Sequence, residues 1–359
     1  MARVAVAGAG AFGRNHLRVY RELETAGLGV ALVAAVEADA KRAEETAAQY
    51  GIPVFLSIEE LLAADLRLDA ASVAVPTVQH HAVASALLDA NLDVLVEKPL
   101  AASLAEADDL IRKVEKNGRI LQPGHLERFN PAVLAVEPRL TRPMFFEAHR
   151  LSVFTPRALD VDVVLDLMIH DLDIVLTFAH SPVREVRAVG LPILSPRVDI
   201  ANVRVEFESG CVANFTASRV STEQVRKLRF FEPRQYVSID YARRDLLVIR
   251  VDAAVDQIPA ELAAAIAAGK VDSATLASLA ANAGGNATPG FRFLKQEVAP
   301  GEPLRLEILS FLESVRTRRT PHVTARQGRA ALELALEIQS TMAAHAQRAG
   351  LVDFFAAGA

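Results

Sequence analysis

The sequence predicts an α/β protein, with an amino-terminal doubly wound parallel sheet followed by an α+β domain that contains antiparallel strands. From residue 3 to about 121, short Val/Ala/Leu runs alternate with longer, charged, alanine-rich stretches, which is typical of strands alternating with helices in a parallel sheet. After Met144 the strands lengthen and alternate with period two. Two of them, 202–208 and 211–218, are joined by the turn Ser209-Gly210, which indicates an antiparallel hairpin.

The element pattern divides the chain into residues 1–122 and 123–359, because its character changes around Pro123. The segment 253–300 is rich in alanine and glycine and predicts an insertion at the rim of the second domain, with a mobile loop at 281–287. Apolar periodicity over 326–347 predicts a helix that closes the second domain. In the first domain we expect strands at 3–7, 30–36, 53–55, 71–75, 93–96 and 119–122.

A glycine-rich turn follows the first predicted strand and precedes a helix. Such a G-x-G-x-x-G turn lets the backbone approach a pyrophosphate and lets the helix pack on the strand, while the helix N-terminus offers N–H groups to the phosphates. An ordinary βα turn is the alternative. The residues predicted to bind a dinucleotide here are Gly8, Gly10, Ala11, Phe12 and Gly13.

Glu37 ends the second predicted strand, 24 residues after Gly13, where the carboxylate that binds the ribose belongs. A carboxylate there accepts hydrogen bonds from the ribose hydroxyls and repels a 2′-phosphate, so it favours NAD over NADP. Arg42 is a second candidate contact that would favour a 2′-phosphate, although a solvated arginine on a charged helix is the simpler interpretation. We therefore expect NAD, with NADP as an alternative.

Bulk composition excludes several function classes. With a net charge of −5, the chain lacks the excess of positive charge that is typical of nucleic-acid-binding proteins. The single cysteine, Cys211, rules out an internal disulfide and a thiolate zinc cluster, which fits a reducing compartment. No uncharged apolar run reaches the length of a membrane span. We expect a cytoplasmic protein that acts on a small molecule, with neither nucleic acid nor membrane as a partner.

Polar residues follow two of the predicted parallel strands, where ligands of doubly wound sheets bind. Pro76, Thr77 and His80 follow the strand 71–75 and are predicted to contact the cofactor, unless this is a simple loop with Thr77 as a helix N-cap. Glu97 and Lys98 end the strand 93–96 and are also predicted cofactor contacts.

Lys98 is the candidate for chemistry among these residues. A lysine buried beside a cationic nicotinamide has a lowered pKa, so it can donate to a substrate oxygen or exchange a proton with it. A solvated side chain is the alternative. A cis peptide before Pro99 would be one way to aim Lys98.

Asp166 and His170 are four residues apart on a predicted helix and share a face, so an imidazole backed by a carboxylate can serve as a general base. One alternative is a plain polar stripe on that helix. A metal site is another, but Asp171 lies off this face, Asp173 lies at its edge, and no second histidine has ligand spacing, so we expect no metal.

The segment at the domain crossover, Gly124 to Pro131, is rich in polar side chains. It is a natural floor for a ligand site, with a polar connecting loop as the alternative. Its predicted substrate contacts, which would act together with Asp166 and His170, are His125, Glu127, Arg128 and Asn130.

These motifs resemble the glucose-fructose oxidoreductase, inositol dehydrogenase and MocA family over nearly the whole chain: GAGAFG at 8–13, PTVQH at 76–80, EKP at 97–99 and D-x-x-x-H at 166–170. The resemblance implies a dehydrogenase with an NAD(P)-binding Rossmann domain. It also implies a second domain whose large, open, mostly antiparallel sheet often forms the oligomer interface, hence a homodimer or homotetramer. Lys98, His170 and Asp166 match the family's catalytic set.

Within the family, the stretches 124–131, 166–173 and 214–219 look most like bacterial UDP-N-acetylglucosamine 3-dehydrogenases. Those enzymes oxidise the sugar C3 hydroxyl to a ketone with NAD, ahead of amination for a diamino sugar of lipid A, which makes a UDP-sugar the expected substrate. The run 163–165 is apolar where many members carry glycines, which alters the wall of the sugar pocket. Another nucleotide sugar, a free sugar or a cyclitol is the alternative substrate, and a non-catalytic NAD-responsive protein is the alternative of another class.

Overall fold

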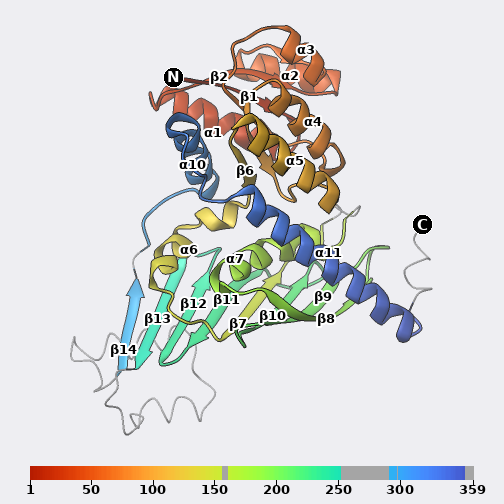
Figure 1. The fold of residues 1–359 in the computed structure, drawn as a ribbon, viewed down its shortest axis with the longest axis vertical. Helices are drawn as coiled ribbons and strands as arrows, with labels where there is room; N and C mark the ends of the chain where they lie inside the picture. The colour runs from red at the N-terminus through yellow and green to blue at the C-terminus, as the bar shows by residue number, and fades with distance from the viewer. Residues whose placement is uncertain (156–160, 252–290, 297, 352–359) are drawn as a thin grey trace. The chain divides into compact units, whose positions relative to one another are not determined.

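The computed structural model describes residues 1–155, 161–251, 291–296 and 298–351 (Figure 1). The chain forms two compact units. The first comprises residues 1–129 and 301–336, and the second comprises residues 130–300 and 337–359. The segment 301–336 therefore belongs to the first unit, whereas the sequence assigned it to the second domain.

The first unit is built on a parallel sheet of six strands in its described residues, in the order β3-β2-β1-β4-β5-β6. This is the doubly wound order, which reverses between β1 and β4, and ligands of such sheets bind beyond the carboxyl ends of the strands at that point. The predicted alternation of strands and helices is confirmed. The strands are β1 Ala2–Ala7, β2 Val30–Val36, β3 Val54–Phe55, β4 Ala70–Val73, β5 Asp93–Glu97 and β6 Leu121–Gly124.

Helices connect these strands, and local capping defines several of their ends. The side chains of Asp39, Ser57 and Ser103 each accept a hydrogen bond from a first-turn N–H, and Gly51 and Gly118 end two helices in the left-handed conformation. The helices of this part are α1 Gly13–Thr25, α2 Ala40–Tyr50, α3 Ile58–Ala63, α4 Thr77–Asp89, α5 Leu104–Asn117 and the 3₁₀ turn η1 Leu126–Phe129.

Helix α10, Pro303–Thr317, explains why the late segment joins the first unit. Leu304, Ile308 and Phe311 recur at helical spacing and are at most 5% exposed in the core cluster that also contains Leu17 and Tyr20 of α1. Burying this apolar face stabilises the first unit. Periodicity in the sequence indicates a helix here but does not say which sheet the helix covers.

The second unit contains a sheet that shows eight strands in the described part of the chain, in the order β14-β13-β12-β11-β7-β10-β9-β8 (Figure 1). Only the β7–β10 pair is parallel among its described pairs, and the predicted hairpin is confirmed as β9 and β10. The strands are β7 Phe145–Leu151, β8 Val183–Leu191, β9 Ile200–Phe207, β10 Val212–Ser218, β11 Val225–Glu232, β12 Gln235–Asp240, β13 Asp245–Val251 and β14 Phe291–Gln296.

Strand β14 falls within the predicted insertion 253–300 and pairs with β13 at the edge of the sheet. The rest of that prediction, including the loop 281–287, lies outside the described residues apart from 298–300. The insertion therefore contributes at least one strand to the sheet.

One face of the second sheet is buried under helix α7, Ile169–Ala179. The rings of Phe146 and Phe230 lie 5.6 Å apart, and Phe178 of α7 meets Phe230 edge-on at 6.2 Å. Truncating one of these rings to alanine would cost about 3–5 kcal/mol. This packing fixes α7 on the sheet.

The remaining helices are α6 Pro131–Val136, the short 3₁₀ turn η2 Glu137–Arg139, the π-helical turn η3 Val164–Met168 and α11 Ala325–Arg348. Helix α11 confirms the helix predicted over 326–347, but its residues up to Leu336 belong to the first unit. In the described residues, no helix combines the length and apolar character needed to cross a membrane.

Candidate active site

The glycine-rich turn after β1 has the close approaches that a dinucleotide-binding turn requires. Gly8 has φ +92°, and a Cβ there would lie 2.6 Å from the carbonyl oxygen of Ala74. A Cβ on Gly13 would lie 1.8 Å from the carbonyl oxygen of Gly8, as expected where a helix packs on a strand. A Cβ on Gly10 meets no atom within 4 Å, which leaves room for a phosphate. The two residues between, Ala11 and Phe12, are exposed.

Glu37 lies at the end of β2, beside this turn. Its carboxylate accepts hydrogen bonds from the backbone N–H of Ala9 at 3.0 Å, from that of Asp39 at 3.0 Å and from Arg42 Nη2 at 3.1 Å. Burial raises the pKa of Glu37, but the hydrogen bonds from Asp39, Ala9 and Arg42 outweigh it and hold the pKa below its ordinary value. The group is therefore an anion, and Arg42 is paired with it.

The turn between β4 and α4 places Pro76 and Thr77 at the carboxyl edge of the sheet. The alternative of an N-capping Thr77 is wrong, because Pro76 is the N-cap residue and no side chain caps this helix. His80 is 1% exposed, and its ring nitrogens lie 2.8 Å from the carbonyl oxygen of Pro99 and 2.9 Å from that of Val75. The ring thus links two loops, and its predicted contact with the cofactor stays a prediction.

Lys98 follows β5 directly and is half-buried, and the peptide bond between Lys98 and Pro99 is cis, as anticipated. Glu97 is 8% exposed and faces away from solvent. Its Oε1 lies 2.9 Å from Nε2 of His16, and a Cβ on Gly124 would lie 2.9 Å from the same carboxyl group. Glu97 therefore contacts α1 and β6, and its predicted contact with the cofactor stays a prediction.

The crossover segment is buried rather than solvent-facing. His125 and Arg128 are each 1% exposed and Glu127 is 8% exposed. Asn130 is the N-cap of α6: its Oδ1 accepts from the N–H two residues on at 3.1 Å, and its Nδ2 donates to the carbonyl oxygen of Tyr241 at 3.2 Å. Both ends of this amide are used within the second unit, so Asn130 has a structural role there, and its predicted substrate contact stays a prediction.

In the second unit, Asp166 lies on the π-helical turn η3 and His170 is the second residue of α7. Asp162 starts this segment, because its Oδ1 accepts the N–H groups of Val164 at 2.9 Å and Leu165 at 3.1 Å. Asp166 and His170 are both half-buried, whereas Val164, Met168 and Ile169 are buried. Single π-helical turns occur frequently at functional sites, and the sequence pattern predicted only a regular helix.

Asp171 has a partner that weakens the metal alternative. Its two carboxylate oxygens bond Nε and Nη2 of Arg150 at 2.7 and 3.1 Å, and both side chains are at most 4% exposed. Because this pair uses both oxygens of Asp171, a metal bound by Asp171 would compete with Arg150 for them. The pair links β7 to α7.

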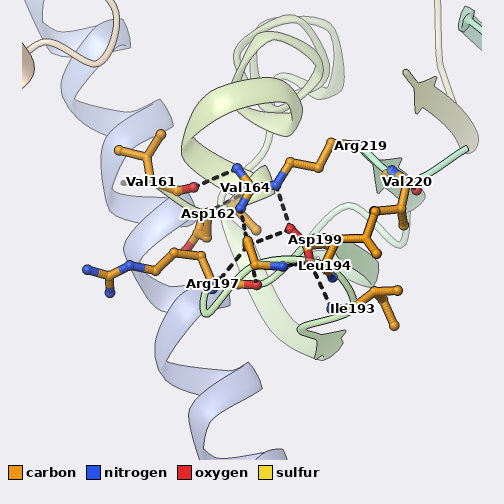
Figure 2. Close-up of polar contacts among 11 residues, drawn as sticks. Val161, Asp162, Val164, Ile193, Leu194, Arg197, Asp199, Arg219 and Val220 are labelled. Atoms are coloured by element: carbon orange, nitrogen blue, oxygen red, sulfur yellow. Dashed lines mark hydrogen bonds and ion pairs between the residues drawn. The ribbon is translucent and has the colours of Figure 1, made fainter. Parts of the chain in front are cut away.

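A second buried ion pair braces the segment before the π-helical turn (Figure 2). Asp199 Oδ1 accepts from Nε of Arg219 at 2.7 Å, and Nη1 of Arg219 donates to the carbonyl oxygen of Val161 at 2.8 Å. Burial raises the pKa of Asp199, but hydrogen bonds from Ser195, Leu194, Arg219 and Ile193 outweigh it and bring the pKa to about 2. Sequence reasoning assigned no role to either partner, since only the fold brings residues 20 apart together.

Comparisons with known proteins agree with this architecture. The model of the oxidoreductase family with an NAD-binding Rossmann fold matches residues 2–125, and that of the GFO/IDH/MocA C-terminal domain matches residues 133–233. The UDP-N-acetylglucosamine 3-dehydrogenase of Acidithiobacillus ferrooxidans is 31% identical over 347 residues, covering 96% of this chain and 99% of its own. Its solved structure superposes with a TM-score of 0.79 at 30% identity, covering 95% of this chain and 98% of its own.

More distant relatives share parts of this similarity. The scyllo-inositol 2-dehydrogenase of Bacillus subtilis is 28% identical over 234 residues, covering 61% of this chain and 68% of its own. The WlbA dehydrogenase of Bordetella pertussis, solved with NADH and UDP-GlcNAcA, has the same fold, with a TM-score of 0.72 at 16% identity over 96% of this chain and 97% of its own. Because family models match parts of both units and a 31% identical relative spans the chain, the chain belongs to the GFO/IDH/MocA family of NAD-binding oxidoreductases.

Proposed function

We propose that this protein is an NAD-dependent dehydrogenase that oxidises the C3 hydroxyl of UDP-N-acetylglucosamine to a ketone, ahead of amination for a diamino sugar of lipid A. The observation that carries the proposal is the full-length similarity to the UDP-N-acetylglucosamine 3-dehydrogenase of Acidithiobacillus ferrooxidans, which covers 96% of this chain and 99% of the relative. A relative that shared only the cofactor-binding part would not support a substrate.

The first unit supports binding of NAD on two counts. The open space over Gly10 accommodates a pyrophosphate at the start of α1, and the anionic Glu37 stands at the end of β2, where a ribose is bound in this fold. Glu37 repels a 2′-phosphate, and Arg42 is engaged with it. These features favour NAD over NADP.

The mechanism assigns one task to each catalytic residue. His170 takes the proton of the ring hydroxyl as general base, Lys98 holds and polarises the same oxygen, and Asp166 orients His170. Bound NAD supplies the hydride acceptor. A correctly placed base contributes roughly 10²–10⁴-fold to the rate. The half-buried positions of all three side chains suit groups that must meet a substrate.

A direct assay tests the substrate. Purified protein with NAD and UDP-N-acetylglucosamine, and with a coupled aminotransferase to remove the ketone, should produce NADH, followed by its absorbance. NADH formed only with a free sugar or a cyclitol would retain the family and replace the substrate, in line with the similarity to the inositol dehydrogenase. Binding of NADH without turnover of any sugar would contradict an enzymatic function.

Cofactor choice is tested by Glu37→Ser. Removing the carboxylate deletes the ribose acceptor and leaves Arg42 without its partner, so we expect kcat/KM with NAD to fall about tenfold and kcat/KM with NADP to rise about tenfold. Steady-state kinetics with both cofactors measure this. Glu44→Ser, which changes an exposed glutamate on α2, the helix that carries Arg42, is the control and should alter neither value. An unchanged NAD to NADP ratio in Glu37→Ser would remove Glu37 from cofactor recognition.

We also propose a cytoplasmic homodimer or homotetramer. The single cysteine fits a reducing compartment. On the second sheet, Phe231 is 37% exposed although its ring stacks on Phe145 at 5.5 Å. Exposed aromatic side chains such as that of Phe231 are enriched at protein interfaces.

A further inference from the structure

Two buried histidines of the first unit contact the residues on either side of Lys98. His16 lies on α1 and is fully buried, and His80 lies on α4 and is 1% exposed. Neither has a task in the proton transfer proposed above. A histidine buried without a structural or chemical task would be costly, because its polar ring atoms lose their hydration.

His16 holds Glu97, the residue before Lys98. Its Nε2 lies 2.9 Å from Oε1 of Glu97, and the ring of Phe12 packs edge-on against the imidazole at 5.6 Å. The Glu97 carboxyl group is closed in from the other side by Gly124, where an added Cβ would lie 2.9 Å from Cδ and 3.0 Å from Cα. A side chain at position 124 would therefore crowd Glu97, and the contacts with His16 and Gly124 enclose the Glu97 side chain on two sides.

His80 holds Pro99, the residue after Lys98. Its Nδ1 lies 2.8 Å from the carbonyl oxygen of Pro99 and its Nε2 lies 2.9 Å from that of Val75. Burial lowers the pKa of His80, and the two carbonyl groups oppose this shift without reversing it. A neutral imidazole carries one N–H, so the ring donates to one of the two carbonyls at a time.

We propose that His16 and His80 are positioning residues that fix Lys98 by holding its two chain neighbours, Glu97 and Pro99. We call these four residues the histidine clamp. The proposal rests on the function proposed above, in which Lys98 holds the reacting oxygen. Lysine has a long, flexible side chain, so its ammonium group is placed accurately only if the backbone that carries it is fixed. A misplacement of about 1 Å can reduce a rate about a hundredfold.

The clamp also joins the cofactor turn to the catalytic lysine. His16 lies one turn into α1, whose N-terminus is the proposed phosphate site, and His80 lies in the helix that follows the turn at Pro76. Each histidine thus bonds an element of the cofactor site to the strand end that carries Lys98. The geometry requires no contact between either histidine and the substrate.

Kinetics of paired variants test this inference. We expect His16→Leu to lower kcat about a hundredfold while KM for the sugar and the Kd for NADH change less than about threefold. His16→Gln keeps a donor near the Nε2 position and should recover most of kcat. For His80, Asn keeps a donor near Nδ1, facing Pro99, and Gln keeps one near Nε2, facing Val75, so His80→Asn should recover more activity than His80→Gln.

Double-mutant cycles with Lys98→Ala test whether the histidines act through Lys98. In the Lys98→Ala background, His16→Leu and His80→Leu should each cost less than about threefold, because the side chain that they position is gone. Equal losses in the presence and absence of Lys98 would overturn the proposal. So would equal recovery by His80→Asn and His80→Gln, since only the former restores the donor to Pro99.

A measurement that needs no substrate tests the histidine clamp independently of the proposed function. The chain has seven lysines, so reductive methylation with isotope-labelled formaldehyde gives few NMR signals, and the signal absent in Lys98→Ala identifies Lys98. We expect it to differ from those of solvated lysines, to move toward them in His16→Leu and His80→Leu, and to return in His16→Gln. A Lys98 signal that stays in place in both Leu variants would overturn the clamp, even if the enzyme oxidises the sugar. Absence of turnover by the wild type, with these signal changes intact, would instead overturn the function.

Discussion

His170→Ala and Lys98→Ala should each reduce turnover by roughly 10²–10⁴-fold, because in the proposed mechanism each side chain acts on the reacting oxygen. Both should leave the Kd for NADH unchanged within about threefold, since the open turn at Gly10 and the carboxylate of Glu37 remain in place. Single-turnover formation of NADH and titration of nicotinamide fluorescence measure the two quantities separately.

Matched controls separate loss of chemistry from loss of fold. Lys116→Ala removes an exposed lysine of α5, and His180→Asn changes an exposed histidine that ends α7 with φ +46°, a conformation that asparagine tolerates. Both controls should retain wild-type kcat. Turnover at the wild-type rate in His170→Ala or in Lys98→Ala would remove that residue from the mechanism.

Asp199→Asn should destabilise the second unit by about 3–5 kcal/mol, because it leaves Arg219 buried without its counter-ion. The amide also presents N–H groups to a site where three backbone N–H groups converge on one carboxylate oxygen. For a unit of this size we expect Tm to fall by roughly 10 °C, measured by thermal unfolding at pH 7. Glu185→Gln, which breaks an exposed ion pair with Arg187, should leave Tm unchanged.

The same variant has a defined pH dependence. The pKa of Asp199 is about 2 in the folded protein, against an ordinary value of 3.8, so its ionisation contributes roughly 2 kcal/mol. Because the folded pKa is lowered, this contribution is complete above pH 4 and is lost as the pH falls toward 2. The difference in free energy of unfolding between wild type and Asp199→Asn, measured in urea, should be constant from pH 7 to pH 5 and should become smaller below pH 4. A free-energy difference that stays constant down to pH 3 would contradict the lowered pKa of Asp199.

The cofactor-binding half of the fold could be predicted because its constraints are local. The turn demands Gly8 for a positive φ and Gly13 for a helix that touches the strand, and both requirements appear in the sequence within six residues. The position of Glu37 at the end of β2 could be predicted by counting residues for the same reason, and its contact with a ribose stays a proposal. Strand and helix periods then supply the order of elements.

Long-range polar contacts could not be predicted in this way. Glu97 bonds to His16 across 81 residues, and Asn130 bonds to Tyr241 across 111 residues, so neither partner is visible in a sequence window. A weak signal existed for His16, which shares the buried face of α1 with Tyr20 and Leu23 at spacings of four and seven. The π-helical turn that carries Asp166 has no recognised pattern in its side chains.

The interrupted first unit has a consequence for synthesis on the ribosome. Residues 130–300 lie between its two parts, and α10 contributes Leu304, Ile308 and Phe311 to its core. At about 5–20 residues per second, roughly 10–30 seconds pass between the emergence of the sheet at the N-terminus and that of α10. The part that leaves the ribosome first therefore stays incomplete until residues 301–336 emerge, and throughout this interval the nascent chain displays the apolar surface of α1 as a target for chaperones.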